Sequence, residues 1–94
     1  MKVRVAHCTP QMNIDEVFAG PTSEAVVLAM QKAVASKVNF ALRLFVNAMS
    51  PLQFAQEVVK RYNEASGKNV PPPRSCDEFI QLGEGEGIAT VLER

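Results

Sequence analysis

The sequence predicts a single α+β domain, residues 1–94, in which helices dominate. Three observations lead to this class. Residues 22–50 contain neither glycine nor proline, residues 51–66 have a clean amphipathic pattern, and both ends of the chain have the composition of strands. With 94 residues and 47% hydrophobic content, the chain can bury one core.

Residues 2–8 are predicted to form the first strand. Val3, Val5 and His7 alternate with polar or small residues, which indicates one buried face. Thr9-Pro10 is expected to end the strand, because proline cannot donate to the ladder. Residues 11–21 are predicted to be a connection with a short turn capped by Asn13, which turns Ile14, Val17 and Phe18 inward.

Residues 22–49 are predicted to form one long helix. Its polar residues follow steps of three and four, which place them in a single narrow stripe: Lys32, Ser36, Asn39, Arg43, Asn47 and Ser50. Residues 37–47 also alternate with a period of two, so the alternative fold is β-α-β-α-β with residues 37–47 as a third strand. We favour the helix because no glycine, proline or aspartate marks an end near Ser36 and Lys37.

The second half of the chain contains two more helices and a closing strand. Ser50-Pro51 begins an amphipathic helix over residues 51–66, and Gly67 is expected to cap its end. Residues 68–74, with three prolines, are predicted to be an extended loop. Ser75 and Glu78 indicate a capping box for a short helix over residues 76–82. Residues 83–87, GEGEG, are predicted to be a flexible turn before a strand over residues 88–93.

Composition excludes several classes of protein. The net charge is zero, and no run of lysine or arginine indicates a nucleic-acid footprint. No stretch of 18 apolar residues is present, so we expect no membrane span. The two cysteines are far apart and no secretory signal is recognised, which favours a reducing, cytoplasmic setting. The basic middle and the acidic residues 75–94 could attract each other within or between chains.

The most reactive-looking residues are His7, Cys8 and Cys76. Adjacent strand residues face opposite ways, so His7 and Cys8 cannot easily act on one atom, and His7 is more simply a partly buried histidine. The dipole at the start of a helix would activate Cys76, but the acidic residues that follow oppose this. Together the three supply one ligand fewer than a structural zinc site needs. We therefore predict no metal and no cofactor.

Two further sets of residues are weaker candidates. Thr22 and Ser23 begin a helix and could bind an anion through free amide groups, although a plain N-cap is simpler. The basic residues of the second half could contact phosphates, since the arrangement of helices faintly resembles a helix-turn-helix. These residues are Lys60, Arg61, Lys68 and Arg74.

The predicted function is that of a small self-associating interaction or accessory module without catalytic activity. A helix this apolar is too large for the rest of the chain to cover, so we expect a homo-oligomer, a dimer or larger. The candidate interface residues are Asn39, Arg43, Asn47, Phe40 and Phe45. The first alternative is a small enzyme or ligand-binding protein with its site at the end of the first strand, at His7 and Cys8. The second is nucleic-acid binding through residues 60–74.

Overall fold

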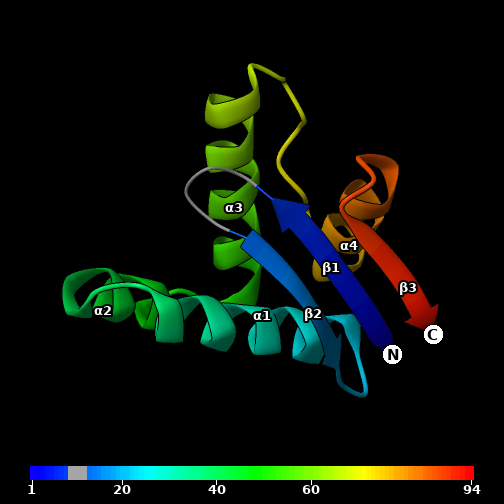
Figure 1. The fold of residues 1–94 in the computed structure, drawn as a ribbon, viewed down its shortest axis with the longest axis horizontal. Helices are drawn as coiled ribbons and strands as arrows, with labels where there is room; N and C mark the ends of the chain where they lie inside the picture. Colours follow the sequence, from blue (N-terminus) through cyan, green and yellow to red (C-terminus); the bar gives the residue numbers. More distant parts are fainter. Residues whose placement is uncertain (9–12) are drawn as a thin grey trace.

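The computed structural model describes residues 1–8 and 13–94, which form four helices and a three-stranded antiparallel sheet (Figure 1). This confirms the predicted helix-dominated α+β class. The elements follow one another as β1 (Lys2–Cys8), β2 (Asn13–Ala19), α1 (Ser23–Lys37), α2 (Phe40–Ala48), α3 (Pro51–Ser66), α4 (Cys76–Gly85) and β3 (Ala89–Glu93).

The sheet has the strand order β2-β1-β3, with β1 in the centre. The predicted terminal strands are confirmed, with β3 beginning one residue later than expected. Val3 is fully buried and Val5 and His7 are partly buried, whereas Lys2, Arg4 and Ala6 are exposed, as the alternation predicts. The expected strand end at Thr9-Pro10 lies outside the described residues.

The third strand was not predicted. Residues 13–19 were expected to be part of a connection, but they pair with the whole of β1, from Lys2 opposite Ala19 to Cys8 opposite Asn13. Phe18 points into the core and Val17 is exposed, which corrects the expectation that both turn inward. The spacing of Ile14, Val17 and Phe18 fits a helical turn, but pairing with β1 decides the conformation.

The predicted long helix 22–49 is wrong in one respect, because it breaks at Val38 and Asn39. Both residues are extended, and the Asn39 side chain accepts a hydrogen bond from the Leu42 amide at 3.0 Å to begin α2. A continuous helix over these residues would be about 42 Å long, whereas the folded chain is only 34 Å in its longest dimension. The alternative strand over residues 37–47 is wrong as well, since residues 40–48 are helical.

The remaining helices agree well with the sequence. Ser50 and Gln53 form a reciprocal capping box at the start of α3, and Gly67 ends it in the left-handed conformation with φ 72°. Ser75 caps α4 through the Glu78 amide at 3.1 Å, but the Glu78 side chain accepts from the Arg74 amide instead of completing the predicted box. The helix continues to Gly85, so the predicted flexible turn at residues 83–87 is largely helical.

The helices cover one face of the sheet and leave the other exposed. The core is made of side chains from β1, β2, α1, α3 and α4, with α2 contributing only Val46. Its largest members include Val3, Phe18, Val26, Val27, Met30, Phe54 and Ile80. In Figure 1, α2 folds back beside the far end of α1, away from the sheet. The fold thus places one short helix at the periphery, with little of its surface covered.

Candidate interaction surface

The most unusual feature of the surface is the apolar side of α2. Phe40 is 72% exposed, Leu44 57% and Phe45 50%, although all three side chains are large and apolar. Ala41 and Ala48 are exposed too. On a helix with 100° between successive residues, these five positions fall within an arc of about 140°. We call these five residues the α2 apolar face.

The opposite side of α2 holds the helix against α1. Val46 is buried there, and the Arg43 Nε donates to the carbonyl of Ala35 in the last turn of α1 at 3.0 Å. This bond satisfies a carbonyl that would otherwise lack an intrahelical partner. Arg43 thereby caps the neighbouring helix, and the predicted interface role of this residue is in part a structural one.

A second side chain caps in the reverse direction. Gln31 of α1 is buried, and its amide nitrogen donates to the carbonyls of Val46 at 2.7 Å and Met49 at 2.8 Å, at the end of α2. The amide oxygen of Gln31 is buried without a hydrogen-bond partner. The two helices therefore form an antiparallel hairpin in which each one caps the other.

The polar stripe predicted from the sequence is gathered between these two helices. Lys32, Ser36, Arg43 and Asn47 line a shallow hollow of about 310 Å³ together with Ala35. Asn39 instead serves as the N-cap of α2. The acidic residues of the C-terminal region do not reach this hollow within the chain. They pair with other basic residues instead: Glu78 with Arg74, Glu84 with Arg94, Glu86 with Lys68 and Glu93 with Lys2.

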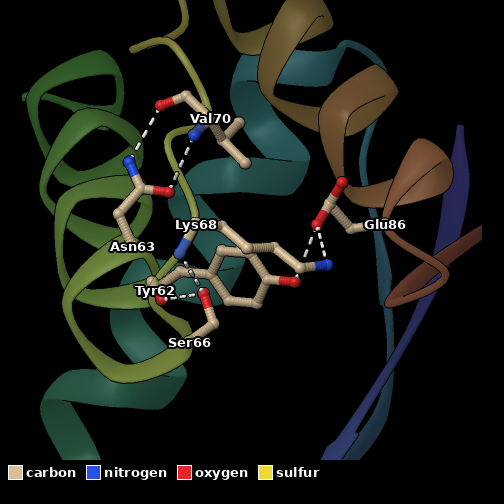
Figure 2. A network of polar contacts seen from close by, with 6 residues as sticks. All are labelled: Tyr62, Asn63, Ser66, Lys68, Val70 and Glu86. Atoms are coloured by element: carbon tan, nitrogen blue, oxygen red, sulfur yellow. Dashed lines mark hydrogen bonds and ion pairs between the residues drawn. The ribbon is translucent and has the colours of Figure 1, made fainter.

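A separate polar network lies at the far end of β1 (Figure 2). The Tyr62 hydroxyl donates to Glu86 at 2.8 Å, and the Lys68 ammonium donates to the same carboxylate oxygen at 2.7 Å. The bond from Lys68, and then that from Tyr62, hold the pKa of Glu86 below its ordinary value. The ring of His7 packs edge-on against Tyr62, with the centroids 6.1 Å apart.

This network fixes the loop after α3 rather than forming an evident catalytic centre. Asn63 binds both backbone groups of Val70, donating to its carbonyl at 2.8 Å and accepting from its amide at 2.9 Å. Ser66 closes the end of the helix by donating to the Tyr62 carbonyl at 2.6 Å (Figure 2). The contacts in Figure 2 are thus made among the protein's own groups.

The structure does not bring the other predicted site residues together. Thr22 and Ser23 follow Gly20, which bonds to Met1, so they lie at the opposite end of β1 from His7. Thr22 acts as the N-cap of α1, bonding the Ala25 amide at 3.1 Å. The described residues contain no group of three or more histidine, cysteine or acidic side chains that could hold a metal. The side chain of Cys8 lies outside the described part of the chain.

Cys76 is buried at the start of α4. Burial raises the pKa of its thiol, and the charges of Glu24 and Asp77 raise it further. A thiol with a raised pKa is mostly protonated near neutral pH and is a poor nucleophile. The local environment therefore opposes the activation that the helix dipole alone would give.

The basic residues of the second half do not form a free positive surface. Arg61 pairs with Glu57 at 3.1 Å, and Lys68 and Arg74 pair with acidic residues as described above. Only Lys60 among the four candidates has no ion pair with a described residue. A basic side chain that is paired with a carboxylate neutralises phosphates less well, so fewer counterions leave the nucleic acid, and this region gives nucleic-acid binding little support.

Comparison of the chain with protein-family models, with curated proteins and with solved structures gives no match. None of the helices among the described residues is both long enough and apolar enough to cross a membrane. The class of protein is therefore described from its fold and its surface alone. It is a small two-layer α+β domain that presents an apolar helix face.

Sequence reasoning selected Phe40 and Phe45 from this face but missed Leu44, although its spacing of four from Phe40 was a sufficient signal.

Proposed function

We propose that this protein is a non-catalytic interaction module that self-associates through the α2 apolar face. The observation that carries the proposal is the exposure of Phe40, Leu44 and Phe45 on one side of one helix. The largest contiguous apolar patch on a protein surface is often a functional site, which supports association through this face. The buried, free thiol of Cys76 is consistent with the reducing, cytoplasmic setting that the sequence favours.

The exposed area is sufficient for a weak complex. Full burial of a Leu or Phe side chain contributes about 1.5–3 kcal/mol, so covering the exposed parts of these three side chains would contribute about 3–5 kcal/mol per chain. A pair of chains gains twice this amount, from which the loss of translational and rotational freedom, about 4–15 kcal/mol, must be subtracted. We expect a dimer that forms and dissociates with concentration rather than a permanent one.

Sedimentation velocity over about 1 μM to about 500 μM tests the proposal. The wild-type mass should rise from that of one chain toward that of two. Phe45→Glu places a charge in the α2 apolar face and should hold the protein monomeric throughout this range. Leu92→Glu is the matched control, because Leu92 is 53% exposed but lies on β3. Its behaviour should be that of the wild type.

Circular dichroism of each variant separates lost association from lost folding. Phe45 is half exposed, so its replacement by a charged residue should leave the helical signal unchanged. A wild-type protein that stays monomeric over the whole range would overturn the proposal, and so would a Phe45→Glu variant that associates as strongly as the wild type.

A further inference from the structure

We infer that the α2 apolar face is covered by α2 of a second copy, which runs antiparallel to it across a two-fold axis with Ala41 of each chain opposite Ala48 of the other. This inference rests on the proposed self-association and adds the partner surface and its orientation. Three observations support it: the absence of charge on the face, the spacing of its two alanines and its total area.

The face carries no charged or polar side chain, so it complements a copy of itself. The single charged residue of α2 is Arg43, which lies on the other side of the helix and is bound to Ala35 of α1. Two copies can therefore meet face to face without bringing like charges together. An acidic or basic partner would gain nothing from this surface beyond its apolar contacts, because it offers no group to pair with a charge.

The positions of the small residues set the direction. Ala41 and Ala48 are seven residues apart and fall near the middle of the face, with the larger Leu44 and Phe45 between them and on either side. In an antiparallel pair centred on Leu44 and Phe45, each alanine meets the alanine of opposite number. Small residues at the contact allow the axes to approach to the short end of the usual range of about 8–10 Å.

The antiparallel direction has two further advantages. It places the positive end of each helix dipole beside the negative end of the other, which is electrostatically favourable. It also makes the contact isologous, so that Ala41 meets Ala48 and Ala48 meets Ala41, and the assembly closes at two chains. A head-to-tail contact would leave one apolar face open at each end of a growing chain.

The area agrees with a weak dimer. At about 200 Å² for a whole phenylalanine, Phe40 and Phe45 together expose about 250 Å² per chain. Leu44 and the two alanines bring the face to about 400–450 Å², and the pair would bury about 800–900 Å². This lies well below the range of about 1,200–2,000 Å² for stable specific interfaces and within that of weak, transient ones.

Disulfide trapping tests the arrangement. In a background with Cys8→Ser and Cys76→Ala, Ala41→Cys and Ala48→Cys are made separately and oxidised with oxidised glutathione. A disulfide requires Cα atoms about 4.4–6.8 Å apart, so it reports which positions face one another. We expect a mixture of the two variants to give covalent dimers in several-fold greater yield than either variant alone. Gln81→Cys, at an exposed position on α4 and away from the α2 apolar face, is the control and should give few.

A second measurement does not depend on removing the buried thiol. Ala41→Glu and Ala48→Lys should each weaken the wild-type dimer in sedimentation, and the double variant should recover part of it, because opposite charges then meet at both ends of an antiparallel pair. Dimers that crosslink through each single variant alone, together with a double variant that does not recover, would overturn the antiparallel arrangement while leaving self-association intact. A wild-type protein that remains monomeric would overturn both.

Discussion

Gln31 is the buried side chain that joins α1 to the end of α2. It is buried, and its amide nitrogen donates to the carbonyls of Val46 and Met49 at the end of α2. Gln31→Glu keeps the shape of the side chain but replaces both donors with a carboxylate oxygen that faces two carbonyl oxygens. A buried charge without a partner costs about 3–5 kcal/mol. Since a chain of this length is stabilised by about 5–14 kcal/mol, this is a large share of the total.

Urea unfolding followed by circular dichroism measures the effect. At pH 7 we expect Gln31→Glu to lose about 3–5 kcal/mol. Burial raises the pKa of the new carboxyl in the folded state above its unfolded value of about 4.3, so the part of the loss that comes from charge should be absent below that pH and grow as the pH rises above it. The loss of one of the two donors remains at any pH. Gln31→Leu, which introduces no charge, should lose about 1–3 kcal/mol at any pH. Gln81→Glu, at an exposed position, is the control.

A Gln31→Glu variant that unfolds within about 1 kcal/mol of the wild type at pH 7 would refute the reasoning. Such a result would mean that the carboxylate reaches water, and hence that the hairpin opens at little cost. An equal loss at pH 4 and pH 7 would show that packing around this position, rather than charge, determines its contribution.

Further predictions concern the ends of elements and the polar network. Gly20→Ala should destabilise by about 1–3 kcal/mol in thermal unfolding, because a Cβ there would lie 2.8 Å from a side chain in the first turn of α1. Asn39→Ala should lose about 1 kcal/mol with the N-cap of α2, and an unchanged melting temperature would contradict the cap. Glu86 has a lowered folded pKa, so its contribution is present above its ordinary value of 4.5 and is lost as the pH falls through the folded value. Tyr62→Phe should therefore flatten the acid limb of the stability profile, as urea titrations at several pH values would show. In a Cys8→Ser background, the Cys76 thiol should react with a disulfide reagent at pH 8 only as fast as the protein unfolds.

Local chemistry was sufficient to predict much of this fold. Thr22, Ser50 and Ser75 each cap the helix that their position in the sequence indicates, because an N-cap needs only the residues within one turn. The strand β1 and the amphipathic helix α3 likewise have an apolar periodicity that indicates their secondary structure whatever element they pack against. These elements depend little on the rest of the chain.

Most of the errors arise from contacts between distant residues. Asn39 is a local N-cap for α2, and the break before it is further stabilised by Gln31 and Arg43, which cap across the hairpin. The last residues of the GEGEG segment are ordered by Tyr62 and Lys68, which are 24 and 18 residues away from Glu86. The spacing of Phe40, Leu44 and Phe45 already placed them on one side of a helix. The sequence could not show that the rest of the chain leaves this side exposed.

The break in the helix explains why the apolar side of α2 is exposed. A helix with one narrow polar stripe has been folded back on itself along that stripe, so that Lys32 and Ser36 of α1 face the same hollow as Arg43 and Asn47 of α2. These four polar residues remain exposed around the hollow. The apolar remainder of α2 must then point outward, where the rest of this small chain does not cover it. The same fold that satisfies the polar stripe therefore leaves a surface that a second chain can cover.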